Sequence, residues 1–134
     1  MSPPKLAPWL EAALRGSLAL FMLVAGVMHF VAPTFYEQIV PPPLPATIIV
    51  ALSGFAEIAL GIGLAFEPTR RAAAWGTVAL LVAVFPANVY MAVSGVQLTD
   101  LPSWMSQPTT AARYARLPVQ LVFLAWAWLV TRRP

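Results

Sequence analysis

Four long apolar stretches dominate the hydropathy pattern of this chain, and short polar or proline-rich segments separate them. The stretches cover approximately residues 9–32, 46–66, 72–94 and 112–131. At roughly 1.5 Å per helical residue, a stretch of this length spans about the 30 Å hydrocarbon core of a bilayer. The pattern therefore predicts an all-α fold, an integral membrane antiparallel four-helix bundle that forms one domain over residues 1–134.

The segment Pro33–Pro45 separates the first two stretches and ends in Val-Pro-Pro-Pro-Leu-Pro. Prolines at this density cannot lie in a helix interior. Four residues of the segment are nevertheless too apolar for a freely solvated loop: Phe35, Tyr36, Ile39 and Val40. We expect this loop to lie in the membrane interface and to cap the bundle.

Two further features shape the remaining stretches. The connection Glu67–Arg71 is so short that it permits only a helical hairpin. Pro86 lies inside the third stretch, where it removes one backbone hydrogen bond and frees a carbonyl near Val82.

The composition supports contact with a lipid bilayer. Apolar residues make up 60% of the chain, charged residues only 10%, and the mean hydropathy is +0.77. A soluble domain carries about 25% charged residues, so most of this surface cannot face water. The basic residues form no continuous stripe with interleaved aromatics, which argues against nucleic acid as a partner. The chain has no cysteine, which excludes disulfides and thiolate metal sites within it.

Lysine and arginine are distributed unevenly between the two ends of the predicted bundle. Four spans place both termini and the second connection on one side, with the basic residues Lys5, Arg15, Arg70, Arg71, Arg132 and Arg133. The opposite side has only Arg113 and Arg116. This bias predicts that both termini are cytoplasmic.

Glu57 is the feature around which the candidate chemistry is organised. It lies near the middle of the second stretch, about 16 Å from its start at 1.5 Å per residue. Gly54 and Gly61, at i−3 and i+4, share its helical face. Such a face suits close packing against another helix and not contact with lipid. We therefore expect Glu57 to point inward and to have partners on other helices.

Polar residues in the outer halves of the other three stretches are the candidate partners. They are His29 in the first, Asn88 and Tyr90 in the third, and Arg116 and Gln120 in the fourth. Together with Glu57 they could line one pocket that opens outward, and we take all six as candidate ligand-binding residues. His29 and Glu57 are also the candidates for a catalytic role.

Each of these residues also has a structural interpretation. Glu57 could lock the bundle, and His29 could lie at the interface with its ring satisfied. Asn88 could bind the carbonyl that Pro86 frees, and Arg116 could anchor to lipid phosphate.

The six candidate residues limit the kinds of reaction and ligand that the protein could support. A metal site needs more ligands than one histidine and one buried carboxyl group. Haem ligation by two histidines would require two copies of His29 from a homodimer. The sequence contains neither a Ser-His-acid arrangement nor a glycine-rich phosphate loop. What remains is acid–base chemistry, proton transfer, or the binding of an amphipathic ligand such as a quinone, with no cofactor held by the chain itself.

Five motifs, in order, resemble the DoxX family of small four-helix membrane proteins. They are Gly26-Val27-Met28-His29-Phe30, the loop Pro33–Pro45, Ser53-Gly54-Phe55-Ala56-Glu57, Phe85-Pro86-Ala87-Asn88-Val89-Tyr90-Met91-Ala92 and Arg116-Leu117-Pro118-Val119-Gln120. The resemblance implies a redox-associated protein of the bacterial inner (plasma) membrane, because the family name derives from a subunit of a thiosulfate:quinone oxidoreductase. The chain lacks the cysteines expected of relatives that handle disulfides.

Two hypotheses follow. In the first, the protein binds a quinone-like or other lipophilic small molecule in the outward-opening pocket. Glu57 and His29 would handle protons, Arg116 would hold Glu57 or an anionic ligand group, and Asn88 and Gln120 would orient the ligand. In the second, the chain is a non-catalytic structural or partner subunit of a membrane enzyme complex. The sequence assigns no reaction, and both a homo-oligomer and a partner membrane protein stay open.

Overall fold

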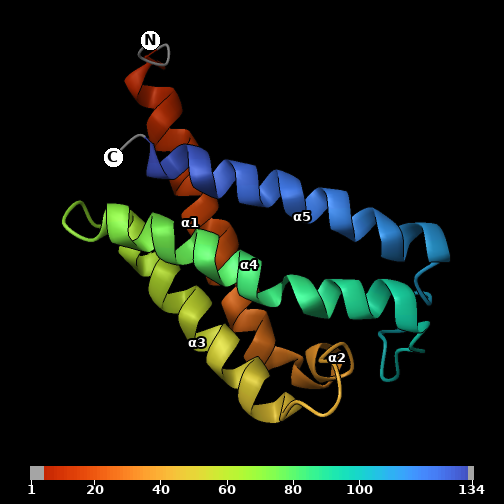
Figure 1. Cartoon of the computed structure of the whole chain (residues 1–134). Helices are drawn as coiled ribbons and strands as arrows, with labels where there is room; N and C mark the ends of the chain where they lie inside the picture. Colours follow the sequence, from red (N-terminus) through yellow and green to blue (C-terminus); the bar gives the residue numbers. More distant parts are fainter. Residues whose placement is uncertain (1–4, 133–134) are drawn as a thin grey trace.

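A computed structural model describes residues 5–132 and is all-helical over that range, with no strand in it (Figure 1). The helices are α1 (Pro8–Val31), α2 (Pro33–Glu37), α3 (Ala46–Ala65), α4 (Arg70–Ser94) and α5 (Thr110–Thr131). The four long helices α1, α3, α4 and α5 are each long and apolar enough to cross a membrane. The expected four-helix composition is therefore confirmed.

Local sequence signals explain most helix boundaries. Pro8 occupies the first position of α1, where its missing N–H costs nothing. Gly95 ends α4 with a φ of +66°, the left-handed conformation typical of a glycine C-cap. The Thr109 side chain accepts a hydrogen bond from the Ala112 amide at 3.1 Å and caps α5. Because of this cap α5 begins at Thr110, two residues before the predicted start. Helix α4 begins at Arg70, also two residues early, without a side-chain cap.

The short helix α2 is not predicted by the hydropathy pattern. Ala32 leaves the helical conformation and Pro33 starts the new helix, so the chain turns sharply at the end of α1. The proline-rich residues 41–45 then lead into α3, as expected. The first connection is thus partly helical, and α2 contacts both α1 and α3.

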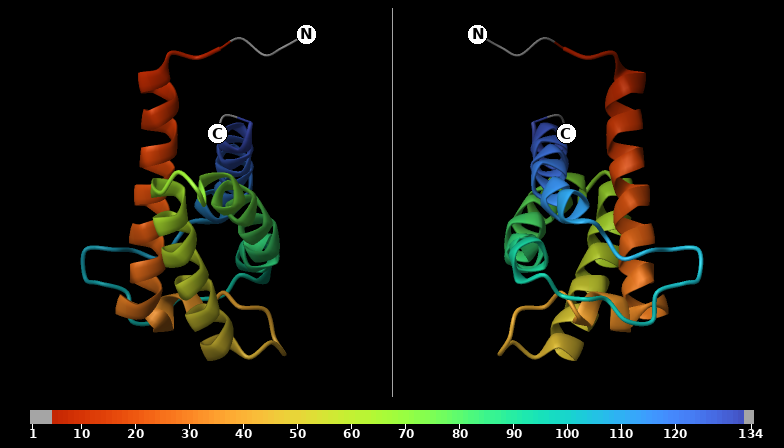
Figure 2. Two further views of the ribbon diagram at one scale, coloured as in Figure 1. Left: turned by 90° about the vertical axis from the view of Figure 1, so that its left-hand side faces the viewer. Right: turned by 90° about the vertical axis from the view of Figure 1, so that its right-hand side faces the viewer.

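The long helices form two closely packed pairs, α1 with α3 and α4 with α5 (Figure 2). Contacts between α3 and α4 join the pairs, and α1 also touches α5. In the described part of the chain, the backbones of α3 and α5 do not approach each other, nor do those of α1 and α4.

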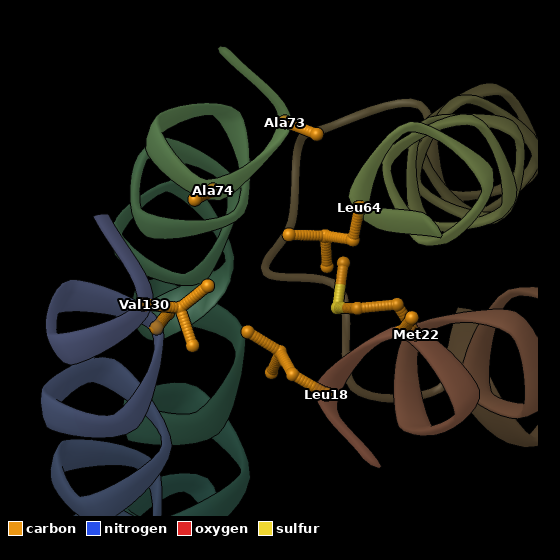
Figure 3. Packing of buried hydrophobic residues seen from close by; sticks show 8 residues of the cluster. Leu18, Met22, Leu64, Ala73, Ala74 and Val130 are labelled. Carbon is orange, nitrogen blue, oxygen red and sulfur yellow. The ribbon is translucent and has the colours of Figure 1, made fainter. Parts of the chain in front are cut away.

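The apolar core lies where the middle of α1 meets the end of α3, the start of α4 and the end of α5. Figure 3 shows its side chains from close by. All four long helices contribute to it, through Leu18, Ala19, Met22, Leu64, Ala73, Ala74, Ala127 and Val130. Trp126, which packs against this core, donates a hydrogen bond to the Leu14 carbonyl at 3.0 Å, which ties α5 to α1. The polar candidates lie between the middle of the long helices and the end of the molecule where α1 ends and α5 begins.

Glycines allow α1 and α3 to pack closely. A Cβ atom at Gly54 would lie 2.8 Å from His29 Cβ, and one at Gly61 would lie 2.8 Å from Leu23 Cγ. A Cβ at Gly26 would lie 2.8 Å from the Gly54 carbonyl oxygen. The prediction that the Gly54–Glu57–Gly61 face packs closely against another helix is confirmed, and that helix is α1.

Candidate functional site

His29 and Glu57 lie together where α1 crosses α3. His29 Nδ1 is 3.1 Å from Glu57 Oε2, and the two side chains are only 11% and 14% exposed. Nδ1 also lies 2.8 Å from the Ala25 carbonyl oxygen. Because a carbonyl oxygen can only accept, Nδ1 carries a hydrogen and donates it to Ala25. Glu57 Oε2 is left buried without a hydrogen-bond partner.

Tyr36 of α2 covers this pair. Its ring stacks on the His29 imidazole, with the ring centroids 3.9 Å apart and the planes inclined by 20°. Burial raises the pKa of the Tyr36 phenol, the charge of Glu57 raises it further, and the charge of Arg116 lowers it. Tyr36 therefore keeps its hydroxyl proton at neutral pH. The candidate set from the sequence does not include Tyr36, and its unusually apolar loop is the signal that pointed to it.

The raised pKa of Tyr36 predicts a pH-dependent stability. Because the folded protein binds the phenolic proton more tightly than the unfolded chain, this contribution is constant below about pH 10, the unperturbed tyrosine value. It is lost as the pH rises through the higher pKa of the folded state. We expect Tyr36→Phe, which keeps the stacked ring, to show a smaller loss of unfolding free energy between pH 9 and pH 11. Denaturant titrations at each pH measure it, and parallel curves for the two proteins would contradict it.

A pair of hydrogen bonds fastens α2 to the connection between α4 and α5. The Gln38 side chain accepts from the Thr99 amide at 2.5 Å and donates to the Thr99 carbonyl at 3.2 Å. Leu98, which precedes Thr99, is held in the same way: the Gln107 side chain accepts from its amide and donates to its carbonyl. The connection is thereby held against the helix that carries Tyr36, and Leu98 is buried.

Asn88 and Gln120 form a separate polar group between α4 and α5. Asn88 Nδ2 donates to Gln120 Oε1, and Gln120 Nε2 donates to the Leu81 carbonyl at 2.7 Å. The structural interpretation of Asn88 is therefore wrong in its donor: Gln120, and not Asn88, binds a carbonyl near Val82, that of Leu81.

The six candidate residues thus do not meet at one point. Within residues 5–132, no hydrogen bond or ion pair links the His29–Glu57 pair to the Asn88–Gln120 pair. Arg116 is partly buried on α5 and acts on Tyr36 by its charge, but it forms no ion pair with Glu57 in this part of the chain. Tyr90 is partly buried on α4, outside both groups.

The arrangement around Glu57 suits proton exchange more than metal binding. Three or more histidine, cysteine, aspartate or glutamate side chains do not gather anywhere in the described range. Glu57 Oε2 can accept a hydrogen bond or take up a proton, and the hydroxyl of Tyr36 can donate one. The three side chains could therefore bind a ligand that carries a carbonyl or hydroxyl group.

Comparison with known proteins places the chain in a family. Residues 18–131 match the family described as Domain of unknown function (DUF8561). The chain belongs to this family. The match includes all of the candidate residues named above, from His29 to Gln120. Neither a curated protein nor a solved structure matches the chain.

Proposed function

We propose that this DUF8561 protein is a DoxX-like, redox-associated integral membrane protein of the bacterial inner membrane. It binds a quinone-like or other lipophilic small molecule beside the His29–Glu57 pair. Its four long helices form an antiparallel bundle in the bilayer, and the site opens on the side away from the termini. The chain's role is binding and proton exchange, and no electron-transfer step is assigned to it.

The surface of the four long helices supports insertion into a bilayer. Large apolar side chains are exposed on each of them, for example Leu20 on α1, Leu52 on α3 and Val122 on α5. Soluble monomers rarely expose contiguous apolar patches larger than a few hundred Å². The glycine contacts support the antiparallel course, because Gly26 approaches Gly54 whereas the earlier Leu23 approaches the later Gly61.

The distribution of basic residues supports cytoplasmic termini. Arg70 and Arg71 start α4, next to the α3–α4 connection, and Arg132 follows α5. Arg113 and Arg116 lie in the first turns of α5, at its opposite end. Arg133 also counts toward the cytoplasmic side but lies outside the described residues. Under the positive-inside rule, this arrangement orients α2 and the His29–Glu57 pair toward the outer half of the bilayer.

The Oε2 atom of Glu57, which accepts no hydrogen bond and has His29 Nδ1 at ion-pair distance, is the observation that carries the proposal. A buried polar atom without a hydrogen bond costs free energy, which a ligand with a matching donor recovers. A quinol hydroxyl would donate to this atom, and a quinone carbonyl would accept from Tyr36 or from a protonated Glu57. A lipophilic ring would be compatible with the aromatic surroundings that Tyr36 and Phe35 provide.

The proposal predicts ligand affinity that depends on the buried pair. We expect decylubiquinone to raise the unfolding temperature of the purified protein in detergent, and Glu57→Gln and His29→Ala to weaken its binding about tenfold or more. Glu67→Gln is the matched control, because Glu67 is an exposed residue of the α3–α4 connection. Titration by intrinsic tryptophan fluorescence gives the dissociation constants.

The same experiment distinguishes ligand binding from the second candidate function, that of a non-catalytic structural or partner subunit. The close α1–α3 contact at Gly26 and Gly54 favours it, because the His29–Glu57 pair would then lock these helices together. In that case both variants would unfold at a lower temperature, and neither would change the response to the quinone.

A further inference from the structure

A cavity of about 140 Å³ lies between α4 and α5, apart from the His29–Glu57 pair. Six residues line it, of which five are apolar: Leu81, Val82, Phe85, Leu121 and Leu124. The sixth is Gln120, which is only 6% exposed. The cavity adjoins the turn of α4 before Pro86, and α5 has its own internal proline at Pro118.

We propose that this cavity is a second ligand site, which takes a single six-membered ring bearing one hydrogen-bond acceptor. Its volume is close to that of the engineered apolar cavity of about 150 Å³ that binds benzene, although this one is open on one side. Its lining of leucine, valine and phenylalanine is of the same kind.

Gln120 supplies the polar contact. Its Oε1 accepts from Asn88 and its Nε2 donates to the Leu81 carbonyl, so the orientation of the amide is fixed. An amide nitrogen has two hydrogens, and the bond to Leu81 uses one of them. These two bonds of Gln120 leave the second hydrogen unassigned, and we assign it to an acceptor on the ring, such as a carbonyl oxygen. Asn88 is then a positioning residue, which holds the Gln120 amide in this orientation.

The site lies halfway along both helices and is reached from the side. Val82 is the central residue of the 25 in α4, and Gln120 is the eleventh of the 22 in α5. Two lining residues, Val82 and Leu121, are 57% and 56% exposed at the surface of the helix pair. A lipophilic ring dissolved in the hydrocarbon phase therefore meets the site directly.

Fluorine NMR of the full chain in detergent micelles tests the proposal with fluorobenzene and 4-fluoroacetophenone as probes. We expect each probe to give a bound signal that saturates and that unlabelled benzene displaces. Leu124→Trp fills the cavity and should abolish the signal, whereas Val122→Trp, at an exposed position on the same helix, should not. Gln120→Leu should bind fluorobenzene as the natural chain does and lose about fivefold to tenfold in affinity for 4-fluoroacetophenone.

Three outcomes would overturn the proposal. They are a probe signal that grows without saturating in the natural chain, a signal that survives in a folded Leu124→Trp variant, and an equal loss of both probes in Gln120→Leu. The first needs no variant, so the test stands even where a substitution prevents folding. Glu57→Gln should leave both signals unchanged, which separates this site from the proposed quinone site.

Discussion

Gly26→Ala is expected to destabilise the protein by about 1–3 kcal/mol, the usual cost of overpacking a close contact. The added Cβ would lie 2.7 Å from Ile58 Cγ1, 2.8 Å from the Gly54 carbonyl oxygen and 2.9 Å from the Ile58 amide nitrogen. Two of these atoms belong to the α3 backbone, which cannot move away as a side chain end can. Helices α1 and α3 must therefore separate, and thermal unfolding in detergent measures the loss.

Gly16→Ala is the matched control on the same helix. Beyond its chain neighbours and the nearby backbone of its own helix, no atom lies within 4 Å of a Cβ built at Gly16, so this variant gains only the better helix propensity of alanine. We expect it to be neutral or more stable by up to about 1 kcal/mol. Equal effects of the two substitutions would show that the close approach of α1 and α3 does not contribute to stability.

Much of the fold could be predicted because helix formation along this chain follows local signals. Long apolar stretches, the short Glu67–Arg71 connection and the proline-rich segment before α3 each act through neighbouring residues. The predicted starts of α4 and α5 lie two residues after the observed ones, Arg70 and Thr110. At Thr110 the boundary depends on a single capping bond from Thr109, which hydropathy does not report.

The helix α2 illustrates what the sequence pattern could not give. A five-residue helix is too short to be stable by itself, so its existence depends on tertiary contacts. These are the packing of α2 on α1 and α3, the stack of Tyr36 on His29 and the bonds between Gln38 and Thr99. The bonds between Gln38 and Thr99 join residues 61 positions apart, a separation that no local pattern reports.

Only part of the grouping of the candidate residues could be predicted from the sequence. The glycine spacing around Glu57 indicated which face meets another helix, and α1 brings His29 to that face. Periodicity does not say which helix lies opposite, or at what crossing angle. Because α3 and α5 do not approach each other in the described chain, Gln120 joins Asn88 instead of Glu57.

His29→Leu is expected to cost about 3–5 kcal/mol of stability, the typical effect of removing one member of a buried ion pair. Leucine supplies neither charge nor hydrogen bond, and Glu57 Oε2 already lacks any other partner. The double variant His29→Leu/Glu57→Leu removes both polar groups and should recover most of this loss, since an apolar pair can replace a buried ion pair at little cost. Equilibrium unfolding of the natural chain, both single variants and the double variant gives the interaction free energy. If the two single losses simply add in the double variant, the 3.1 Å approach carries no energetic coupling, and Glu57 must be stabilised by something other than His29.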